Sequence, residues 1–153
     1  MNVKEKDFDP EMLLEKPLMA HLSSYCAEGP RDSPIWFLWQ EERLWLFGNE
    51  DDSFTSRLAV DPRCAVGIVD FHLEQGVLLH LGIRGRAVIH TVNLEKRNAF
   101  VSKYLGDEDS WNPWFTKHIV NTISLMIEII PETLVARDVS FFKETPNPYQ
   151  NKT

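Results

Sequence analysis

Residues 33–39 read SPIWFLW, residues 43–49 read RLWLFGN, and residues 53–71 read SFTSRLAVDPRCAVGIVDF. The first two segments are rich in tryptophan and phenylalanine and flank a polar loop, which is typical of a β-hairpin. The third segment begins at Ser53, a good helix N-cap, and its helical part stops at Asp61-Pro62, because proline disfavours a helical residue before it. Residues 34–71 are therefore expected to form strand, turn, strand, short helix and strand.

Apolar residues alternate with polar ones outside this unit as well. The pattern is clearest over residues 77–90, where His80, Arg84 and Arg86 share one face and aliphatic side chains share the other. Further strands are expected at about 18–26, 32–40, 44–47, 64–71, 122–130 and 133–142, with Pro131-Glu132 separating the last two. Helices are expected at 94–105 and from Trp111 to about Val120.

The two ends of the chain differ from its middle. Asp9-Pro10 is a helix-start signal, so residues 1–16 are expected to form an N-terminal helix. Residues 143–153 are rich in proline and asparagine and are expected to be a loose tail. Because no repeat or linker divides residues 1–153, they predict a single, mainly β domain, a small antiparallel barrel of six to seven strands with short peripheral helices.

Composition limits the classes of partner. The 153 residues include 23 acidic and 16 basic side chains, for a net charge of −7. This balance argues against nucleic-acid binding, although a small anion needs only two or three local bases. No apolar run approaches the ~18 residues of a membrane span, and the polar start does not resemble a secretory signal. Cys26 and Cys64 are interpreted as buried thiols rather than a disulfide, so a cytoplasmic location is expected.

Several polar side chains have a spacing that suits an anion. Ser53 and Arg57 lie one turn apart at a helix N-terminus, where a phosphate would meet free N–H groups and a guanidinium. Arg84 and Arg86 lie ~6.6 Å apart along one strand face. Each also has an ordinary interpretation, since Ser53 suits a plain N-cap and the arginines suit ion pairs at the surface. His80 is either a hydrogen-bonding group for a ligand or a structural histidine.

No spacing of histidine, cysteine or acidic residues indicates a metal site. The histidines show no His-x-x-x-His pattern, and the two cysteines are far apart in sequence. No nucleophile and base can be paired from their spacing either. The sequence therefore predicts no metal and leaves the catalytic residues unassigned.

Four pieces taken together resemble the pyridoxamine 5′-phosphate oxidase-like family of FMN-binding split barrels. They are residues 33–37, residues 44–49, the helix end at 57–63 and residues 85–88, and the resemblance covers roughly Pro17 to Ala136. It implies an antiparallel split barrel that forms a homodimer with FMN at the subunit interface. It also implies that the flavin phosphate lies near the short helix and the ring against the two aromatic strands.

Carried over position by position, the resemblance implies a set of flavin contacts. Those nearest the ring and its edge are Trp36, Phe37, Phe47, Gly48, Asn49 and His80. Ser53 falls in the phosphate-binding turn. The family often has a lysine where this chain has Phe54, so the resemblance implies that Arg57, or the pair Arg84 and Arg86, replaces its charge. The chain also lacks the Arg-Leu-His-Asp-Arg-like block with which the vitamin B6 oxidases bind substrate, which argues against pyridoxamine phosphate.

The function that follows is an FMN-dependent oxidoreductase acting on a small molecule, with a reduced nicotinamide or an oxidisable metabolite as electron donor. Because the flavin carries the electrons, no acid–base pair need be visible. Three alternatives remain open from the sequence. They are a non-catalytic flavin-binding or flavin-sensing protein, a haem- or deazaflavin-binding relative in which His80 coordinates the ligand, and a barrel without a ligand.

Overall fold

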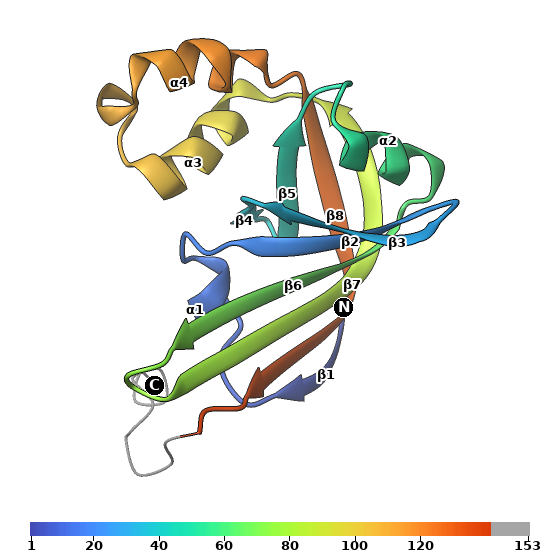
Figure 1. The fold of residues 1–153 in the computed structure, drawn as a ribbon, viewed down its shortest axis with the longest axis vertical. Coiled ribbons are helices and arrows are strands. Elements are labelled where there is room, and N and C mark those ends of the chain that lie inside the picture. The colour runs from blue at the N-terminus through green and yellow to red at the C-terminus, as the bar shows by residue number, and fades with distance from the viewer. Residues whose placement is uncertain (142–153) are drawn as a thin grey trace.

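The computed structural model describes residues 1–141 and contains one eight-stranded sheet (Figure 1). Seven strands follow one path in the order β3-β2-β6-β7-β8-β5-β4, and β1 pairs with β8 beside this path. The ends of the path, β3 and β4, do not pair, so the curved sheet stays open as a split barrel. The strands are β1 (Asn2–Lys6), β2 (Ala20–Cys26), β3 (Gly29–Ile35), β4 (Leu38–Gln40), β5 (Arg43–Gly48), β6 (Arg63–His72), β7 (Val77–Thr91) and β8 (Leu125–Asp138).

Short helices lie around the sheet. They are α1 (Glu11–Leu14), α2 (Ser53–Val60), α3 (Leu94–Leu105) and α4 (Pro113–His118), with 3-10 turns at Glu108–Ser110 (η1) and Val120–Thr122 (η2). Asparagine side chains fix the starts of α3 and α4, since Asn93 accepts from the Lys96 N–H and Asn112 accepts from the Trp114 N–H. Figure 1 shows α3 and α4 together beside one end of β5, with α1 toward the opposite end of the sheet.

The two longest strands, β7 and β8, pair antiparallel along nearly their whole length. The far edge of β8 is shared, because β5 pairs with its first half and β1 pairs parallel with its second half. The β7–β8 ladder shifts register between Arg84 and Gly85, where Glu132 is the extra residue of a bulge. A Cβ at Gly85 would collide with the Ile130 carbonyl, so the close approach of the strands at this bulge requires glycine.

Two apolar clusters fill the molecule. The larger lies inside the curved sheet and includes Phe37, Leu79, Leu81 and Ile127, all of them fully buried. The smaller lies between β4–β5 and the α3–α4 layer and is largely aromatic; its buried members are Leu38, Trp45, Phe100, Val101, Trp111, Val120 and Met126. Helices α3 and α4 are thus held to the sheet by a core of their own, at the end of β5 where the candidate site lies.

The mainly β, antiparallel split-barrel class is confirmed, although the sheet has eight strands where six to seven were expected. Three local predictions are wrong. Residues 2–6 form β1 rather than helix, because they pair with the free edge of β8, and only Glu11–Leu14 are α-helical. The strand expected at 32–40 breaks after Ile35, since the Phe37 N–H donates to the Tyr104 hydroxyl instead of a strand. Strands expected at 122–130 and 133–142 are one strand, β8, which tolerates Pro131 at the bulge.

Two further expectations concern the cysteines and the chain end. Cys26 and Cys64 are both free thiols, but Cys64 is buried as expected whereas Cys26 is only half-buried. Burial raises the pKa of Cys64 to about 12, which keeps it protonated. The expected tail at 143–153 lies outside the described residues. Among the helices of residues 1–141, none is long and apolar enough to cross a membrane.

Candidate functional site

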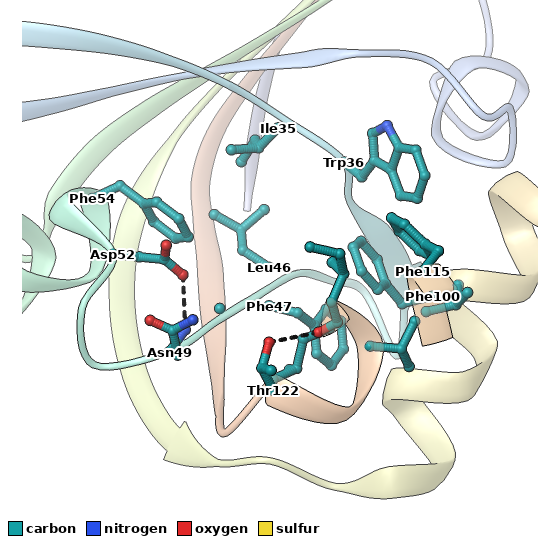
Figure 2. A pocket seen from close by; sticks show the side chains of 15 residues that line it. Ile35, Trp36, Leu46, Phe47, Asn49, Asp52, Phe54, Phe100, Phe115 and Thr122 are labelled. Carbon is teal, nitrogen blue, oxygen red and sulfur yellow. Dashed lines mark hydrogen bonds between the residues drawn. The ribbon is translucent and has the colours of Figure 1, made fainter. Parts of the chain in front are cut away.

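A pocket of about 390 Å³ opens at the end of β5 (Figure 2), and we call it the aromatic pocket. The β3–β4 connection, the end of β5 and the loop before α2 form one side, and α3, α4 and η2 form the other. Its lining residues are Ile35, Trp36, Leu46, Phe47, Gly48, Asn49, Asp52, Phe54, Phe100, Val101, Phe115, Ile119, Val120, Thr122 and Ile123. The pocket is therefore mostly apolar, with a few polar groups at its β5 end.

Stacked rings build one wall of the aromatic pocket. The Trp36 ring lies parallel to Tyr104, with centroids 4.3 Å apart and planes at 4°. Phe47 stacks on Phe100 with centroids 4.5 Å apart. These contacts join the β3–β5 side to α3, so the wall is held by packing from both layers. Such a wall suits a flat, aromatic ligand.

The Tyr104 hydroxyl ties this wall to the sheet. It donates to the Leu18 carbonyl at 2.7 Å and accepts from the Phe37 N–H at 3.1 Å. Burial raises the pKa of Tyr104 to about 12, so the hydroxyl keeps its proton and remains a donor. The ring that stacks on Trp36 is therefore fixed by two hydrogen bonds to backbone.

The loop after β5 forms the polar end of the pocket. The Asp52 carboxylate accepts from the Asn49 N–H at 2.8 Å, and the Asn49 side chain accepts from the Asp51 N–H at 3.0 Å. Asp52 is packed so closely over Gly48 that a Cβ there would lie 2.5 Å from Asp52 Oδ2 and 3.0 Å from Phe54 Cζ. Figure 2 shows Asn49, Asp52 and Phe54 on one side of the pocket and Trp36 and Phe115 on the opposite side. Of the fifteen lining residues, Asp52 is the one that carries a charge, and it is negative.

The expected phosphate residues of α2 lie outside the aromatic pocket. Asp52, rather than Ser53, is the N-cap residue, which corrects the expected cap, and Ser53 is the exposed first residue of the helix. Arg57 directs its guanidinium to hydroxyls of β2 and β3, donating to Ser24 Oγ at 2.8 Å and to Ser33 Oγ at 2.9 Å. Those contacts anchor α2 to the sheet.

The remaining predicted site residues lie in three places: the aromatic pocket, the main core and the outer face of β7. Trp36, Phe47, Gly48 and Asn49 come together in the aromatic pocket, whereas Phe37 is fully buried in the main core. His80, Arg84 and Arg86 lie on the outer face of β7, where Arg86 pairs with Glu132 at 3.1 Å and the other two line a separate cavity. The structure thus brings four of the ten expected residues together.

Sequence reasoning missed the helical side of the pocket. Phe100 and Val101 lie in the helix expected at 94–105, and Phe115 lies in the helix expected from Trp111, but nothing in their spacing showed that they face β5. The two tryptophans near the start of α4 do not line the pocket: Trp111 is buried and donates to the Gly106 carbonyl, whereas Trp114 is 63% exposed. A helix pattern shows which face is apolar, and only tertiary packing shows what that face covers.

Lys103 is a second feature that the sequence did not indicate. Its ammonium donates to the Leu14 carbonyl at 2.9 Å and the Phe37 carbonyl at 3.1 Å, linking α3 to α1 and to the β3–β4 connection. Burial lowers the pKa of Lys103 to about 7. Within residues 1–141, no group of three or more histidine, cysteine or acidic side chains is arranged to hold a metal ion.

No protein-family model matches the sequence, and no curated protein matches it. Solved structures do match the fold. A putative pyridoxamine 5′-phosphate oxidase from Listeria innocua superimposes with a TM-score of 0.61 at 20% identity, over 86% of this chain and 95% of that one. An F420 reductase gives a TM-score of 0.62 at 22% identity, over 81% and 94% of the two chains.

A FAD-binding protein from Mesorhizobium loti gives a TM-score of 0.63 at 16% identity, over 85% of this chain and 92% of that chain. All three proteins are covered over nearly their whole length. At these identities the likeness concerns the fold. The chain has the split-barrel fold of the pyridoxamine 5′-phosphate oxidase-like proteins, as the four sequence pieces had indicated.

Proposed function

We propose that the chain binds a flavin, FMN, with its ring in the aromatic pocket, and acts as a flavin-dependent oxidoreductase on a small molecule. The observation that carries this proposal is the pocket itself, whose volume is about 390 Å³, whose wall is built of stacked rings and whose β5 end carries the polar side chains of Asn49 and Asp52. A ligand that is flat, aromatic and polar along one edge matches that lining. The fold is also that of proteins named for a flavin or for F420.

The residues of the pocket fit the ring of FMN better than its phosphate. Apolar rings can hold the isoalloxazine, but the lining offers no cation, and Asp52 would repel a dianion. We therefore propose that the working form is a homodimer with the flavin at the subunit interface, in which the second subunit contributes to the site. When bound, the flavin supplies the electron transfer, and the chain binds the ring, orients it and keeps water from it.

Ligand binding is the first test. Purified protein is incubated with FMN, separated from free ligand, and examined for absorbance near about 450 nm and for mass in solution. Trp36→Ala removes a wall residue, whereas Trp114→Ala removes an exposed tryptophan that does not line the pocket. We expect the first variant to weaken flavin binding by at least about 10-fold and the second to retain it. Protein that retains no flavin, or equal loss in both variants, would contradict the proposal.

Turnover separates the enzyme from a flavin-binding or flavin-sensing protein. We expect the flavin-loaded protein to oxidise NADH or NADPH, or to be reduced by a small metabolite, at a rate that depends on Trp36. Bound flavin with no reduction by either class of donor would favour the non-catalytic alternative. A deazaflavin would be recognised by its different absorbance spectrum. For haem the pocket offers no support, because no histidine within residues 1–141 lines it.

A further inference from the structure

The outer face of the sheet carries a second cavity, of about 410 Å³, which we call the basic cavity. It lies over β6, β7 and β8 and is reached by β1 and β2. Its polar side chains are Lys4, Ser23, His80, Arg84, Thr133 and Arg137. No acidic residue lines it, although acidic side chains outnumber basic ones by 23 to 16 in the whole chain.

Two glycines create the hollow. Gly67 and Gly82 are directly paired across β6 and β7, so the sheet has no side chain at either position. His80 leans over them, since a Cβ at Gly82 would lie 3.4 Å from His80 Cε1 and one at Gly67 would lie 3.9 Å from His80 Nε2. Both distances are ordinary van der Waals contacts, so the backbone does not require glycine there. The absence of side chains at Gly67 and Gly82 leaves open space beneath the His80 imidazole.

The positive charge of the basic cavity is largely uncompensated. Arg137 pairs with Glu5 at 2.8 Å, and the two side chains are 53% and 42% exposed. Neither Lys4 nor Arg84 takes part in an ion pair with any other described residue, whereas Arg86, two positions along the same face, pairs with Glu132. Lys4 reaches the cavity because β1 runs parallel beside the second half of β8. Strands β1, β7 and β8 therefore each place one cation, Lys4, Arg84 and Arg137, at the basic cavity.

We propose that the basic cavity binds a phosphate group. Guanidinium and ammonium groups form charge-assisted hydrogen bonds to phosphate, the Ser23 and Thr133 hydroxyls add neutral donors, and the glycine floor lets a tetrahedral anion approach the sheet. The phosphate has two sources with the same chemistry. It belongs either to a free phosphorylated metabolite or to the flavin held in the aromatic pocket of a second copy, and only the second source rests on the function proposed above.

Titration with inorganic phosphate tests the site without any flavin. Wild-type protein is followed by calorimetry and by the amide NMR signals of Gly67 and Gly82. Arg84→Gln and Lys4→Gln each remove a lining cation from an exposed strand position, and Arg97→Gln removes the same charge from α3 as a control. We expect saturable binding that weakens about 10-fold or more in the first two variants and is unchanged in the control. Absence of saturable binding up to about 10 mM phosphate, or equal weakening by Arg97→Gln, would overturn the proposal.

A steric variant gives an independent check that leaves every charge in place. Gly67→Val projects a branched side chain, well suited to a strand, into the floor of the cavity. We expect it to fold, as judged by thermal unfolding, and to lose phosphate binding to the same extent as Arg84→Gln. Retention of wild-type phosphate affinity in folded Gly67→Val would contradict a site in this hollow.

FMN and riboflavin distinguish the two sources, because they share a ring and differ by the phosphate. If the phosphate is that of a flavin, Arg84→Gln lowers FMN affinity toward that of riboflavin, and inorganic phosphate competes with FMN. If the phosphate bound in the basic cavity belongs to a separate metabolite, inorganic phosphate binds without changing FMN affinity. Phosphate binding without any flavin binding would reject the proposed function and leave the anion site standing. Flavin binding with no Arg84-dependent phosphate binding would reject the anion site and leave the proposed function standing.

Discussion

The ammonium of Lys103 lies 3.5 Å from the centroid of the Phe37 ring, and it donates to the carbonyl of the same residue. Phe37 is fully buried beneath the ammonium, so the Lys103 side chain of α3 covers the connection between β3 and β4, where the strand expected at 32–40 breaks. The ring and the carbonyls stabilise the charged amine, while burial opposes it and lowers the pKa of Lys103 to about 7.

This environment predicts how stability depends on pH. The folded-state pKa of Lys103 is below its ordinary value of 10.5, so between pH 7 and 10.5 the unfolded chain binds more protons and the free energy of unfolding rises with pH. Lys103 contributes at most about 1.4 kcal/mol per pH unit, less after solvent screening of this half-buried group. Above pH 9 the raised pKa of Cys64 acts in the opposite sense, so the rise is best measured between pH 7 and 9.

Two variants isolate this contribution. Lys103→Met carries no charge at any of these pH values, and Lys103→Arg carries one at all of them. Urea unfolding at several pH values is expected to show a smaller rise with pH in both variants than in the wild type. An unchanged rise in both would mean that another group titrates.

Removal of the Tyr104 hydroxyl should loosen the wall of the aromatic pocket. Tyr104→Phe leaves the Phe37 N–H without its partner, and an unsatisfied buried donor costs about 1–3 kcal/mol. We expect the free energy of unfolding to fall by about that amount, and flavin to bind more weakly because a ring without its two hydrogen bonds positions Trp36 less firmly. Chemical unfolding and flavin titration on the same preparation measure both. Unchanged stability would show that the Phe37 N–H finds another acceptor.

Gly67 of β6 and Gly85 of β7 should differ sharply in their tolerance of alanine. Gly85→Ala would drive a Cβ into the Ile130 backbone carbonyl, and we expect a loss of about 3 kcal/mol or failure to fold. Gly67→Ala meets nothing closer than 3.9 Å and is expected to change stability by less than about 1 kcal/mol. Thermal unfolding of the two variants side by side tests the bulge geometry, and equal losses would contradict it.

The hydroxyl of Thr55 offers a stabilising change. Thr55 Oγ1 is buried on α2 and is the one buried side-chain polar atom among residues 1–141 that lacks a hydrogen-bond partner. Thr55→Val keeps the side-chain shape and removes the unpaired group, so we expect a gain of about 1 kcal/mol and a melting temperature about 3 °C higher. Thr122→Val is the control, because the Thr122 hydroxyl donates to the Ile119 carbonyl at 2.7 Å and its loss brings no gain. A drop in stability for Thr55→Val would indicate a water partner.

A lysine at position 54 should favour FMN over riboflavin. Phe54 lines the aromatic pocket beside Asp52, at the position where the sequence resemblance to FMN-binding split barrels implies a lysine. Phe54→Lys would offset the negative charge of Asp52, and we expect the ratio of FMN to riboflavin affinity to rise about 10-fold. Phe54→Met, which keeps the position apolar, should leave the ratio unchanged. Fluorescence titration with both flavins measures it, and an equal change in both variants would place the phosphate elsewhere.

Most of the sheet could be predicted because its pattern is local. The alternation over 77–90 gave β7 and the correct face for each of its side chains, and the segment 43–49 gave β5. Period-two burial appears directly in the order of residues, and so do the proline and glycine signals that end the elements. The prediction failed at Asn2–Lys6, at the break after Ile35 and at Pro131, where pairing with distant residues overrides the local signal.

The sequence by itself determined the mainly β, antiparallel class of fold, its alternating strands, and the aromatic character of the residues at the end of β5. The tertiary structure alone decided that α3 and α4 close a pocket over Phe47, that Arg57 is held by Ser24 and Ser33, and that Lys4 joins Arg84 on the outer face. The physical reason is separation along the chain: each of these contacts joins residues at least 24 positions apart, and no periodicity within one segment encodes which distant segment packs against it.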